Sequence, residues 1–464
     1  MLGGDEDLPV LHFKKHYRLS MPVIPDNLDR LRHLIRVSGI TNVAVFGGDG
    51  VCVFNAEFMG DGFQKVIDGA LEKTAGPNRR EQAFVDGGTV YAPAVKEQGA
   101  IVRERMPRLA AGPQGELHLV YFSDASGSND VFLRSFAGGK WSDDVPIAAT
   151  AADEYAPAVA ALGKGMALVA YVSNEGGRYD IYTSIVKGGK PQKRVRLTTS
   201  RDDAMAPSLG SGPNATAWLA WYEWAKMGGL SRDREVLVAT LKGGGWSKPL
   251  QVSPREVPAY EDHADPSVFA DGKGGAWVAW AWDYHGTLRQ KVPVEENSIF
   301  ARHVDRSLKL GEVLAVGYRG AGRARDYVPS LAVSAEGVPW IAWDNSHKAS
   351  VGPNAKAIFV NRLAGKDFGE QSEAATSGGA IDSPRLIADT KGGLHLIWGQ
   401  ETGSGSELWA RPVGPKAMGE ARKLAVRGKR PRYPAAAFDT AGKLWVAYTD
   451  AGASPWKVEV EPLD

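Results

Sequence analysis

Two histidines flank a predicted strand pair in the segment DHADPSVFADGKGGAWVAWAWDYH, and their types and spacing suggest acid–base chemistry. His263 precedes the first strand and His285 follows the second. Antiparallel strands joined by a tight turn bring their outer ends together, so we expect both imidazoles at the same end of the pair. A neutral imidazole can abstract a proton or bind a metal ion. Arg325 and Tyr327, just before Pro329, complete a candidate catalytic set in which His263 or Tyr327 is the base and Arg325 stabilises a developing enolate.

A second set of charged and aromatic residues lies just before seven prolines of the chain. Like charges gather at one place only with a cation, a ligand or mutual pairing, so a polar ligand or a divalent cation is a candidate partner for this set. Capping of loop backbone by the short polar side chains is the structural alternative. Trp221, Trp224, Trp282 and Tyr284 offer rings on which a sugar can stack. The candidate ligand-binding residues are Arg105, Glu154, Tyr155, Asp203, Asp262, Trp282, Tyr284, Asp382, Arg432 and Tyr433.

The positions of these residues follow a sequence repeat that occurs seven times, at intervals of 50 to 63 residues. A Tyr or Trp lies fourteen residues after each anchor proline, and an aliphatic residue lies two positions before that ring, as the period of a strand requires. Glycine lies eight residues after each anchor except in the third repeat, where the residue is Ala215. The anchors are Pro107, Pro157, Pro207, Pro266, Pro329, Pro384 and Pro434.

Each repeat predicts four antiparallel strands. The first opens at the proline, a tight glycine-rich turn leads to the second, a variable loop leads to the third, and another glycine-rich turn leads to the fourth. Seven such units are typical of a β-propeller. The fold class is therefore mainly β: a seven-bladed propeller of four-stranded blades, spanning residues 85–464.

The last repeat is too short for four strands, because only 31 residues remain from Pro434 to the end. The segment TVYAPAV, residues 89–95, is strand-like and occupies the place of a fourth strand before the first repeat. We expect it to complete the seventh blade, which would leave no open sheet edge.

Residues 1–84 predict a small α/β segment. A strand HYRLSMPV, a helix from Asp26 to Val37, strands TNVAVF and VCVFNAEF and a helix DGFQKVIDGALEK follow one another. This order resembles the C-terminal half of a thioredoxin-like fold. The chain has one cysteine, Cys52, which excludes an internal disulfide and a cysteine-based zinc site, and we expect this thiol to be buried and inert.

Loop lengths indicate which face of the propeller carries function. The loops after the second strands vary widely, whereas the tight turns are short and glycine-rich throughout, so we expect the site on the loop face around the central channel. His118 and His395 occupy a slot that Trp fills in other repeats, and we expect them to be structural. The run RGKRPR, residues 427–432, is expected to be a solvated loop leading to the same face.

Charge and hydropathy exclude several partners. The chain has 55 basic and 54 acidic residues, a formal net charge of +1, so no global field favours nucleic acid. No run of about 18 apolar residues predicts membrane insertion. The N-terminus MLGGDEDLPVLHF has no export signal, which places the chain in the cytoplasm if nothing precedes it, and in the periplasm or outside the cell if a leader was removed.

The repeat P-S-L-A-x-x-x-x-G-x-x-W-I-A-W resembles sialidase-like and TolB-like propellers over residues 85–464, which implies the architecture. The sialidase Asp-box pattern is not found. The arrangement of His263, Pro266, His285 and Tyr327 is similar to that of propeller polysaccharide lyases of the ulvan-degrading kind. That resemblance implies a His and a Tyr as base and acid and an Arg that neutralises a uronate carboxylate. The place where this Arg is sought holds Asp344, so Arg319, Arg323 or Arg325 would have to substitute.

Three hypotheses of function follow. The first is a monomeric, cofactor-free propeller that recognises a polar or acidic carbohydrate on its loop face, with a divalent cation at the channel mouth as an open alternative. The second is a polysaccharide lyase. The third is a non-catalytic scaffold that binds a protein on the same face.

Overall fold

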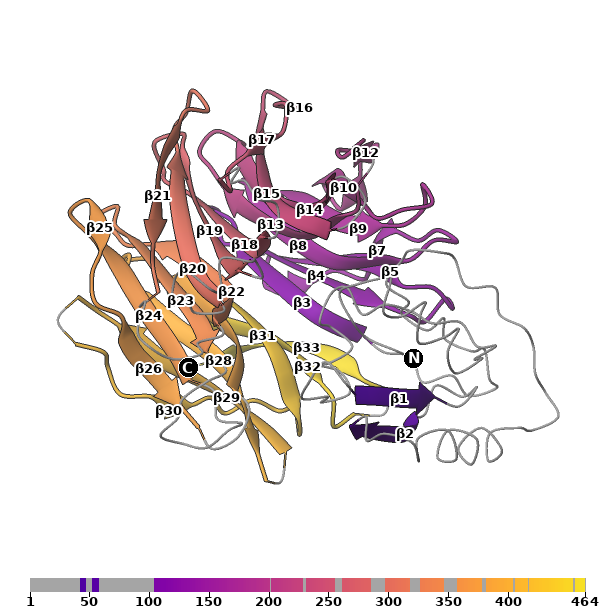
Figure 1. Ribbon diagram of the computed structural model, residues 1–464. Coiled ribbons are helices and arrows are strands. Elements are labelled where there is room, and N and C mark those ends of the chain that lie inside the picture. Colours follow the sequence, from indigo (N-terminus) through magenta and orange to yellow (C-terminus); the bar gives the residue numbers. More distant parts are fainter. Residues whose placement is uncertain are drawn as a thin grey trace. The chain divides into compact units, whose positions relative to one another are not determined.

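A computed structural model describes most of the propeller and a small part of the segment before it (Figure 1). The described residues are 42–46, 52–57, 104–200, 202–227, 231–254, 261–284, 297–317, 326–345, 357–377, 381–403, 405–415, 417–453 and 455–463. The chain divides into two compact units, Met1–Ala100 and Ile101–Asp464.

The first unit is described only at an antiparallel strand pair, β1 (Asn42–Phe46) and β2 (Cys52–Glu57). These are the strands expected in TNVAVF and VCVFNAEF. The predicted helices, the boundary at residues 84–85 and the strand expected at residues 89–95 lie outside the described residues. The thioredoxin-like arrangement therefore stays a prediction.

The second unit is a ring of seven antiparallel blades, which confirms the predicted fold class. In blades 1, 2, 3 and 5 the outer strand is split into two pieces. Blade 1 contains β3 (Glu104–Ala111), β4 (Leu117–Ser123), β5 (Asp130–Ala137), β6 (Lys140–Trp141) and β7 (Val145–Ala148). Blade 2 contains β8 (Glu154–Gly163), β9 (Met166–Ser173), β10 (Asp180–Lys187), β11 (Lys190–Pro191) and β12 (Val195–Arg196). Blade 3 contains β13 (Ala204–Ser211), β14 (Ala217–Met227), β15 (Ser231–Lys242), β16 (Gly245–Trp246) and β17 (Leu250–Gln251).

The remaining blades follow the same order. Blade 4 contains β18 (Glu261–Ala270), β19 (Ala276–Tyr284), β20 (Asn297–Val304) and β21 (Leu310–Ala315). Blade 5 contains β22 (Asp326–Val333), β23 (Pro339–Asn345), β24 (Ala357–Ala364), β25 (Asp367–Phe368) and β26 (Ser372–Thr376). Blade 6 contains β27 (Ile381–Ala388), β28 (Leu394–Thr402), β29 (Gly405–Val413) and β30 (Arg422–Lys423), and the described part of blade 7 contains β31 (Pro431–Phe438), β32 (Leu444–Asp450) and β33 (Lys457–Leu463).

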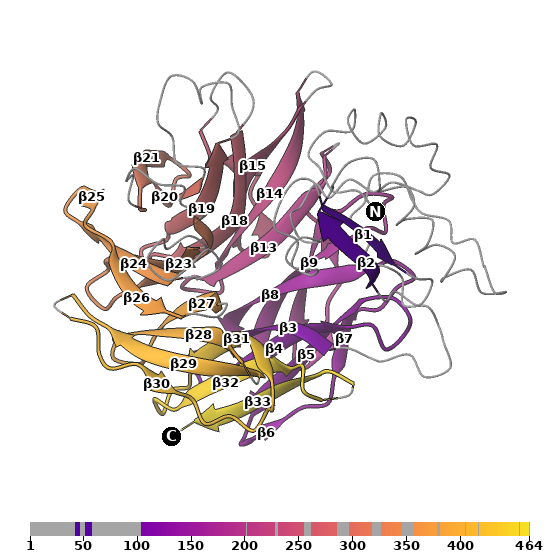
Figure 2. The same cartoon turned by 60° about the horizontal axis from the view of Figure 1, so that its bottom comes forward.

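The first strands of the blades form the inner wall of the ring. Each of them contacts the first strand of the next blade, and β31 contacts β3, so the ring closes. Figure 2 shows these strands innermost, with the later strands of each blade further out.

The repeated aromatic and aliphatic residues form the core between blades. The seven rings are between 0 and 2% exposed, and the seven aliphatic partners are all 0% exposed. This burial confirms the repeat as a packing unit. The rings are Tyr121, Tyr171, Trp221, Trp280, Trp343, Trp398 and Tyr448.

The prediction that each first strand begins at its anchor proline is wrong. The prolines lie inside these strands. In all seven blades the strand begins earlier, and the register shifts by one residue at the proline. Two residues of the first strand, the proline and the residue before it, lie opposite a single residue of the second strand, the repeated Tyr or Trp. In blade 1, for example, Met106 and Pro107 lie opposite Tyr121. Such a β-bulge leaves a backbone group outside the ladder, and proline has no N–H to lose there.

The residue before each anchor adopts a left-handed conformation in every blade, with φ between 48° and 54°. None of the seven is glycine, and Val328 is even β-branched, so the bulge is held by the surrounding structure against a local cost of about 1 kcal/mol or more. The seven residues are Met106, Ala156, Ala206, Asp265, Val328, Ser383 and Tyr433.

Serine hydroxyls connect neighbouring inner strands. Ser208, Ser267 and Ser330 each follow an anchor proline, and each Oγ accepts a hydrogen bond from an inner-strand N–H of the next blade, at 3.2, 3.1 and 2.9 Å. This position therefore lies along the wall of the ring, beside the open edge of the neighbouring strand.

Candidate functional site

His263 is buried at the start of β18, and the structure gives it a structural partner. Its side chain is 2% exposed, and Nδ1 accepts a hydrogen bond of 2.9 Å from the indole Nε1 of Trp280. Burial lowers the pKa of this imidazole to about 3. A ring enclosed in this way cannot reach a substrate without rearrangement, so its geometry does not favour the role of a general base.

The other candidate catalytic residues lie at the limits of the described part of the chain. The backbone of Tyr327 pairs with Asp344 at the outer end of β22 and β23. His285 and Arg325 lie outside the described residues, as does the side chain of Tyr327. Their catalytic roles stay predictions.

Arg105 and Arg432 occupy equivalent positions, two residues before the anchors of blades 1 and 7. One Nη of Arg105 contacts Asp124 at 3.0 Å and Asn129 at 2.9 Å, and the guanidinium lies over the ring of Phe122. Arg432 pairs with Glu401 of blade 6. The side chains are 18% and 22% exposed, so both guanidinium groups are oriented by carboxylates and partly open to solvent.

The acidic residues before the next two anchors connect blades. Asp153 Oδ1 accepts hydrogen bonds from the backbone and side-chain nitrogens of Asn129, at 3.1 and 2.9 Å. Asp203 Oδ1 accepts one of 3.0 Å from the N–H of Tyr179 in the same way. Each carboxylate thus accepts hydrogen bonds from neutral N–H groups just before the third strand of the preceding blade, which is the capping role given above as the structural alternative. The sequence analysis had instead placed these carboxylates in a ligand site around the central channel.

Glu154 and Tyr155 are also enclosed. Glu154 is 0% exposed and its Oε1 accepts hydrogen bonds from Thr150 and Ser173, at 2.6 and 3.2 Å; burial raises its pKa. Tyr155 is 1% exposed and packs edge-on against Tyr179. Both side chains are therefore closed to solvent, and their roles in ligand binding stay predictions.

The remaining predicted ligand-binding residues fall on strand ends. In the backbone ladder Asp262 pairs with Asp283, Tyr284 with Glu261 and Asp382 with Gly399. Trp282 packs against His263 and Phe300, with ring centroids 4.9 and 4.5 Å apart. Tyr433 is the left-handed residue of the blade 7 bulge.

Three further expectations concern single side chains. Trp221 is 0% exposed, so it is a core residue and cannot stack on a sugar, and the side chain of Trp224 lies outside the described part. His118 and His395 are held by Ser135 and Asp389, at 2.9 and 3.2 Å, as expected for structural residues. In the run RGKRPR, Arg427 is 70% exposed and pairs with Glu461.

Two arginines on the inner strands were not among the predicted site residues. Arg108 and Arg385 each follow an anchor proline, in blades 1 and 6, where the other five blades have Ala or Ser. Burial lowers the pKa of Arg108 well below its usual range, and the charge of Arg385 lowers it further. The sequence does mark these two residues, because Arg stands in two repeats where the other five have Ala or Ser.

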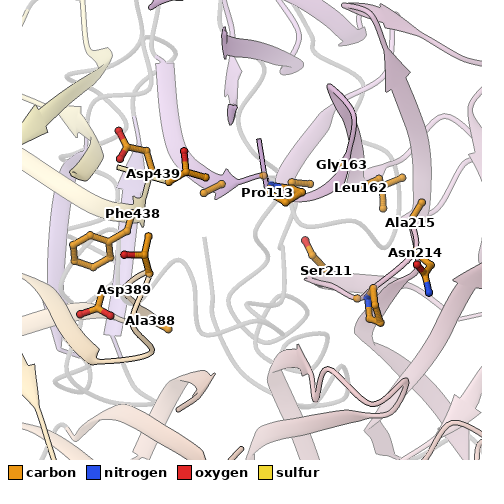
Figure 3. A pocket seen from close by; sticks show the side chains of 17 residues that line it. Pro113, Leu162, Gly163, Ser211, Asn214, Ala215, Ala388, Asp389, Phe438 and Asp439 are labelled. Atoms are coloured by element: carbon orange, nitrogen blue, oxygen red, sulfur yellow. The ribbon is translucent and has the colours of Figure 1, made fainter. Parts of the chain in front are cut away.

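A cavity of about 580 Å³ opens on the opposite, tight-turn face. It is lined by the ends of the first strands and the turns of blades 1, 2, 3, 6 and 7, among them Pro113, Leu162 and Ser211 (Figure 3). Asp389 and Asp439 lie at its edge, but their carboxylates accept hydrogen bonds from N–H groups of their own turns. The cavity therefore offers small polar and apolar groups rather than a catalytic pair.

Within the described ranges, no group of three or more His, Cys, Asp or Glu side chains is placed to hold a metal ion. In that same part of the chain, no helix has the length and apolar character needed to cross a bilayer.

The comparisons with known proteins identify the fold. No protein-family model matches the chain, and no curated protein sequence matches it. Among solved structures, a polysaccharide lyase described as an ulvan lyase is 10% identical, with a TM-score of 0.53 over 79% of this chain and 94% of the other. Another polysaccharide lyase is 12% identical, with a TM-score of 0.51 over 83% and 95%. With the closed ring, these likenesses define the class of this protein as a seven-bladed β-propeller.

Proposed function

We propose that this propeller binds a polar or acidic carbohydrate on its loop face, around the channel. The observation that carries the proposal is the pair Arg105 and Arg432, at equivalent positions of the adjoining blades 1 and 7. Each guanidinium is fixed by a carboxylate and keeps part of its surface open. A guanidinium fixed in this way can bind a carboxylate or sulfate group of a sugar with little loss of side-chain entropy.

The fold is compatible with this ligand class. One of the similar structures, the ulvan lyase, is bound to a saccharide of glucuronate and 3-sulfated rhamnose; it is 11% identical and has a TM-score of 0.50 over 79% of this chain and 94% of that one. A likeness at this level concerns the fold, so the ligand class rests on the two arginines. The finer resemblance to sialidase-like and TolB-like propellers stays a prediction.

Lyase chemistry is the less favoured alternative, because His263 is buried and bonded to Trp280. His285, Tyr327 and Arg325 stay candidates for a site built without it. Absorbance of an unsaturated product, followed with uronate-containing polysaccharides, tests this alternative directly.

Binding to a panel of acidic and neutral polysaccharides, measured by affinity electrophoresis, tests the proposed function. We expect retention by at least one acidic polysaccharide and a loss of roughly tenfold or more in affinity for Arg105→Gln and Arg432→Gln. Arg306→Gln removes the same charge from an exposed turn and serves as the control. Arg432→Lys keeps the charge without the planar fork, and thermal unfolding reports whether each variant is folded.

Two outcomes would overturn the proposal. One is a failure of the wild-type protein to bind any acidic member of the panel. The other is an equal change in affinity for the Arg306→Gln control and the two loop-face variants. The first result would favour the protein-binding scaffold, and the second would show that Arg105 and Arg432 do not form the binding site.

A further inference from the structure

Asp130 and Glu154 are two buried carboxylates at the junction of blades 1 and 2. Asp130 begins β5 and is 2% exposed, and Glu154 begins β8 and is 0% exposed. The two strands are in contact, and the N–H of Glu154 donates a hydrogen bond of 2.7 Å to the carbonyl oxygen of Asn129, the neighbour of Asp130. The two carboxylates therefore enter the same junction from different blades.

Hydroxyl groups connect the two carboxylates. Ser126 donates to Oδ2 of Asp130, and the hydroxyl of Ser128 lies 3.5 Å from Oδ1 of Asp130 and 3.1 Å from the carbonyl oxygen of Thr150. The hydroxyl of Thr150 in turn donates to Oε1 of Glu154 at 2.6 Å. Oε2 of Glu154 is buried and has no hydrogen-bond partner among the described residues. The side chains that meet here therefore present only oxygen atoms, and one carboxylate oxygen is left for another ligand.

Among the described residues, no Lys, Arg or His forms an ion pair with either carboxylate of this junction. Burial raises the pKa of both carboxyl groups, and the charge of Asp130 raises that of Glu154 further. Two like charges in a desolvated place repel each other unless a cation or a proton compensates them.

Blade 2 shows how the same carboxylate is compensated by cations of the chain itself. Asp180 begins β10 as Asp130 begins β5, and it is 0% exposed. Two arginines, Arg178 and Arg196, form ion pairs with its two oxygens at 3.3 and 2.5 Å. A buried carboxylate at this position of a blade is therefore compatible with the fold when positive charge lies beside it.

Blade 1 lacks both of these arginines. Ser128 takes the place of Arg178, two residues before the carboxylate, and the register of the outer strand puts Pro146 in the place of Arg196. A proton on the free oxygen of Glu154 would have no acceptor there, whereas a metal cation would be bound by that oxygen. A bound cation therefore fits the junction better than a proton does.

We propose that the junction of blades 1 and 2 binds a calcium ion between Asp130 and Glu154. The hydroxyls of Ser126 and Ser128 and the carbonyl group of Thr150 supply further oxygen ligands. Calcium takes about six to eight oxygens in flexible geometry, whereas magnesium needs a nearly ideal octahedron. Ser126 is exposed and Ser128 half-buried, so the ion enters from the side of the loop.

The same loop holds Arg105 in place. Asp124 and Asn129 belong to the loop, and both contact the guanidinium of Arg105. A bound calcium ion therefore also fixes the partners of this arginine. This consequence for saccharide binding rests on the proposed function, whereas the calcium site itself does not, since its test uses no saccharide.

Thermal unfolding of the chelator-treated protein in rising concentrations of calcium chloride, at constant ionic strength and pH 7, tests the proposal. We expect the Tm of the wild-type protein to rise and then to saturate, as mass action requires of a site specific to the native state, with a smaller response to magnesium chloride. Asp130→Asn and Glu154→Gln should each weaken the apparent Kd for calcium by roughly tenfold or more. Asp180→Asn, which changes the equivalent carboxylate of blade 2, should leave the calcium response unchanged.

Ser128→Arg separates a cation site from a purely structural role, because it copies the arrangement of blade 2. A guanidinium at this place supplies the missing charge, so the variant should be more stable than the wild type without calcium and should no longer respond to calcium. If Asp130→Asn fails to fold, Ser128→Ala removes one ligand without changing the charge and should weaken the response. The proposal is overturned if calcium gives no saturating rise in the wild-type Tm, or if it raises the Tm of the wild type and of Ser128→Arg equally.

Discussion

The indole Nε1 of Trp280 donates a hydrogen bond of 2.9 Å to Nδ1 of His263. An indole nitrogen can only donate, so this contact requires Nδ1 of the imidazole to be unprotonated. Trp280 is 0% and His263 2% exposed. The pair thus fills the interior of blade 4 as a neutral unit, and protonation of the histidine would break it.

This pair predicts an acid-labile fold. The pKa of His263 is lowered from 6.5 to about 3 by burial, so between these values the unfolded chain binds a proton that the native state does not. Stability from this residue is full above pH 6.5 and falls as the pH drops toward 3, by up to about 5 kcal/mol. Urea unfolding across this range should show a flatter pH dependence for His263→Gln.

Trp280→Phe is the matched control for the histidine. It removes the donor but keeps the site apolar, and burial is the cause of the lowered pKa. We expect a less stable protein with the same pH dependence as the wild type. An unchanged slope in His263→Gln would show that another group carries the acid response.

The third repeat contains a backbone position that a glycine would suit better. Ala215 has φ 56°, whereas the other six repeats have glycine with positive φ at this place. Ala215→Gly should stabilise the protein by up to about 1 kcal/mol, because the left-handed conformation is strained for alanine. Gly165→Ala is the reciprocal change, at φ 67° with no atom within 4 Å of the added methyl group, and should cost about 1 kcal/mol. Chemical denaturation measures both; changes of the same sign would contradict the explanation.

The serine contacts between blades predict a loss of stability on removal of one hydroxyl. Ser330 is 8% exposed, and its Oγ accepts the N–H of Leu386 at 2.9 Å. Ser330→Ala leaves that N–H without its acceptor and should destabilise the ring by about 1–3 kcal/mol. Ser307→Ala, at an exposed turn, should have little effect. A similar midpoint for both variants in denaturant would exclude this contribution.

For Glu154 we expect a contribution to stability that depends on pH in the direction opposite to that of His263. Burial raises its pKa above 4.5, so the protonated form is favoured in the native state. Its contribution is present below pH 4.5 and is lost as the pH rises through the native pKa. Glu154→Gln, which stays neutral, should therefore be at least as stable as the wild type at pH 7 and lose that advantage near pH 4. Glu312→Gln, on the surface, should show no such crossover.

The amino-acid sequence by itself determined the number of blades and their packing layer. The spacing of Trp343 from Pro329, and of Ile341 from Trp343, repeats in all seven blades, and every one of these rings and aliphatic residues is buried. Such a pattern is local: a strand places alternate side chains on one face, so its period can be read without knowing which blade lies opposite.

Only the tertiary structure decided what the residues around the prolines do. The bulge at Asp265 and Pro266 places His263 in the core, and the equivalent turn of the chain directs Asp153 against Asn129 of the preceding blade. These contacts join residues far apart in the chain, and a period along the sequence carries no information about which of them will meet.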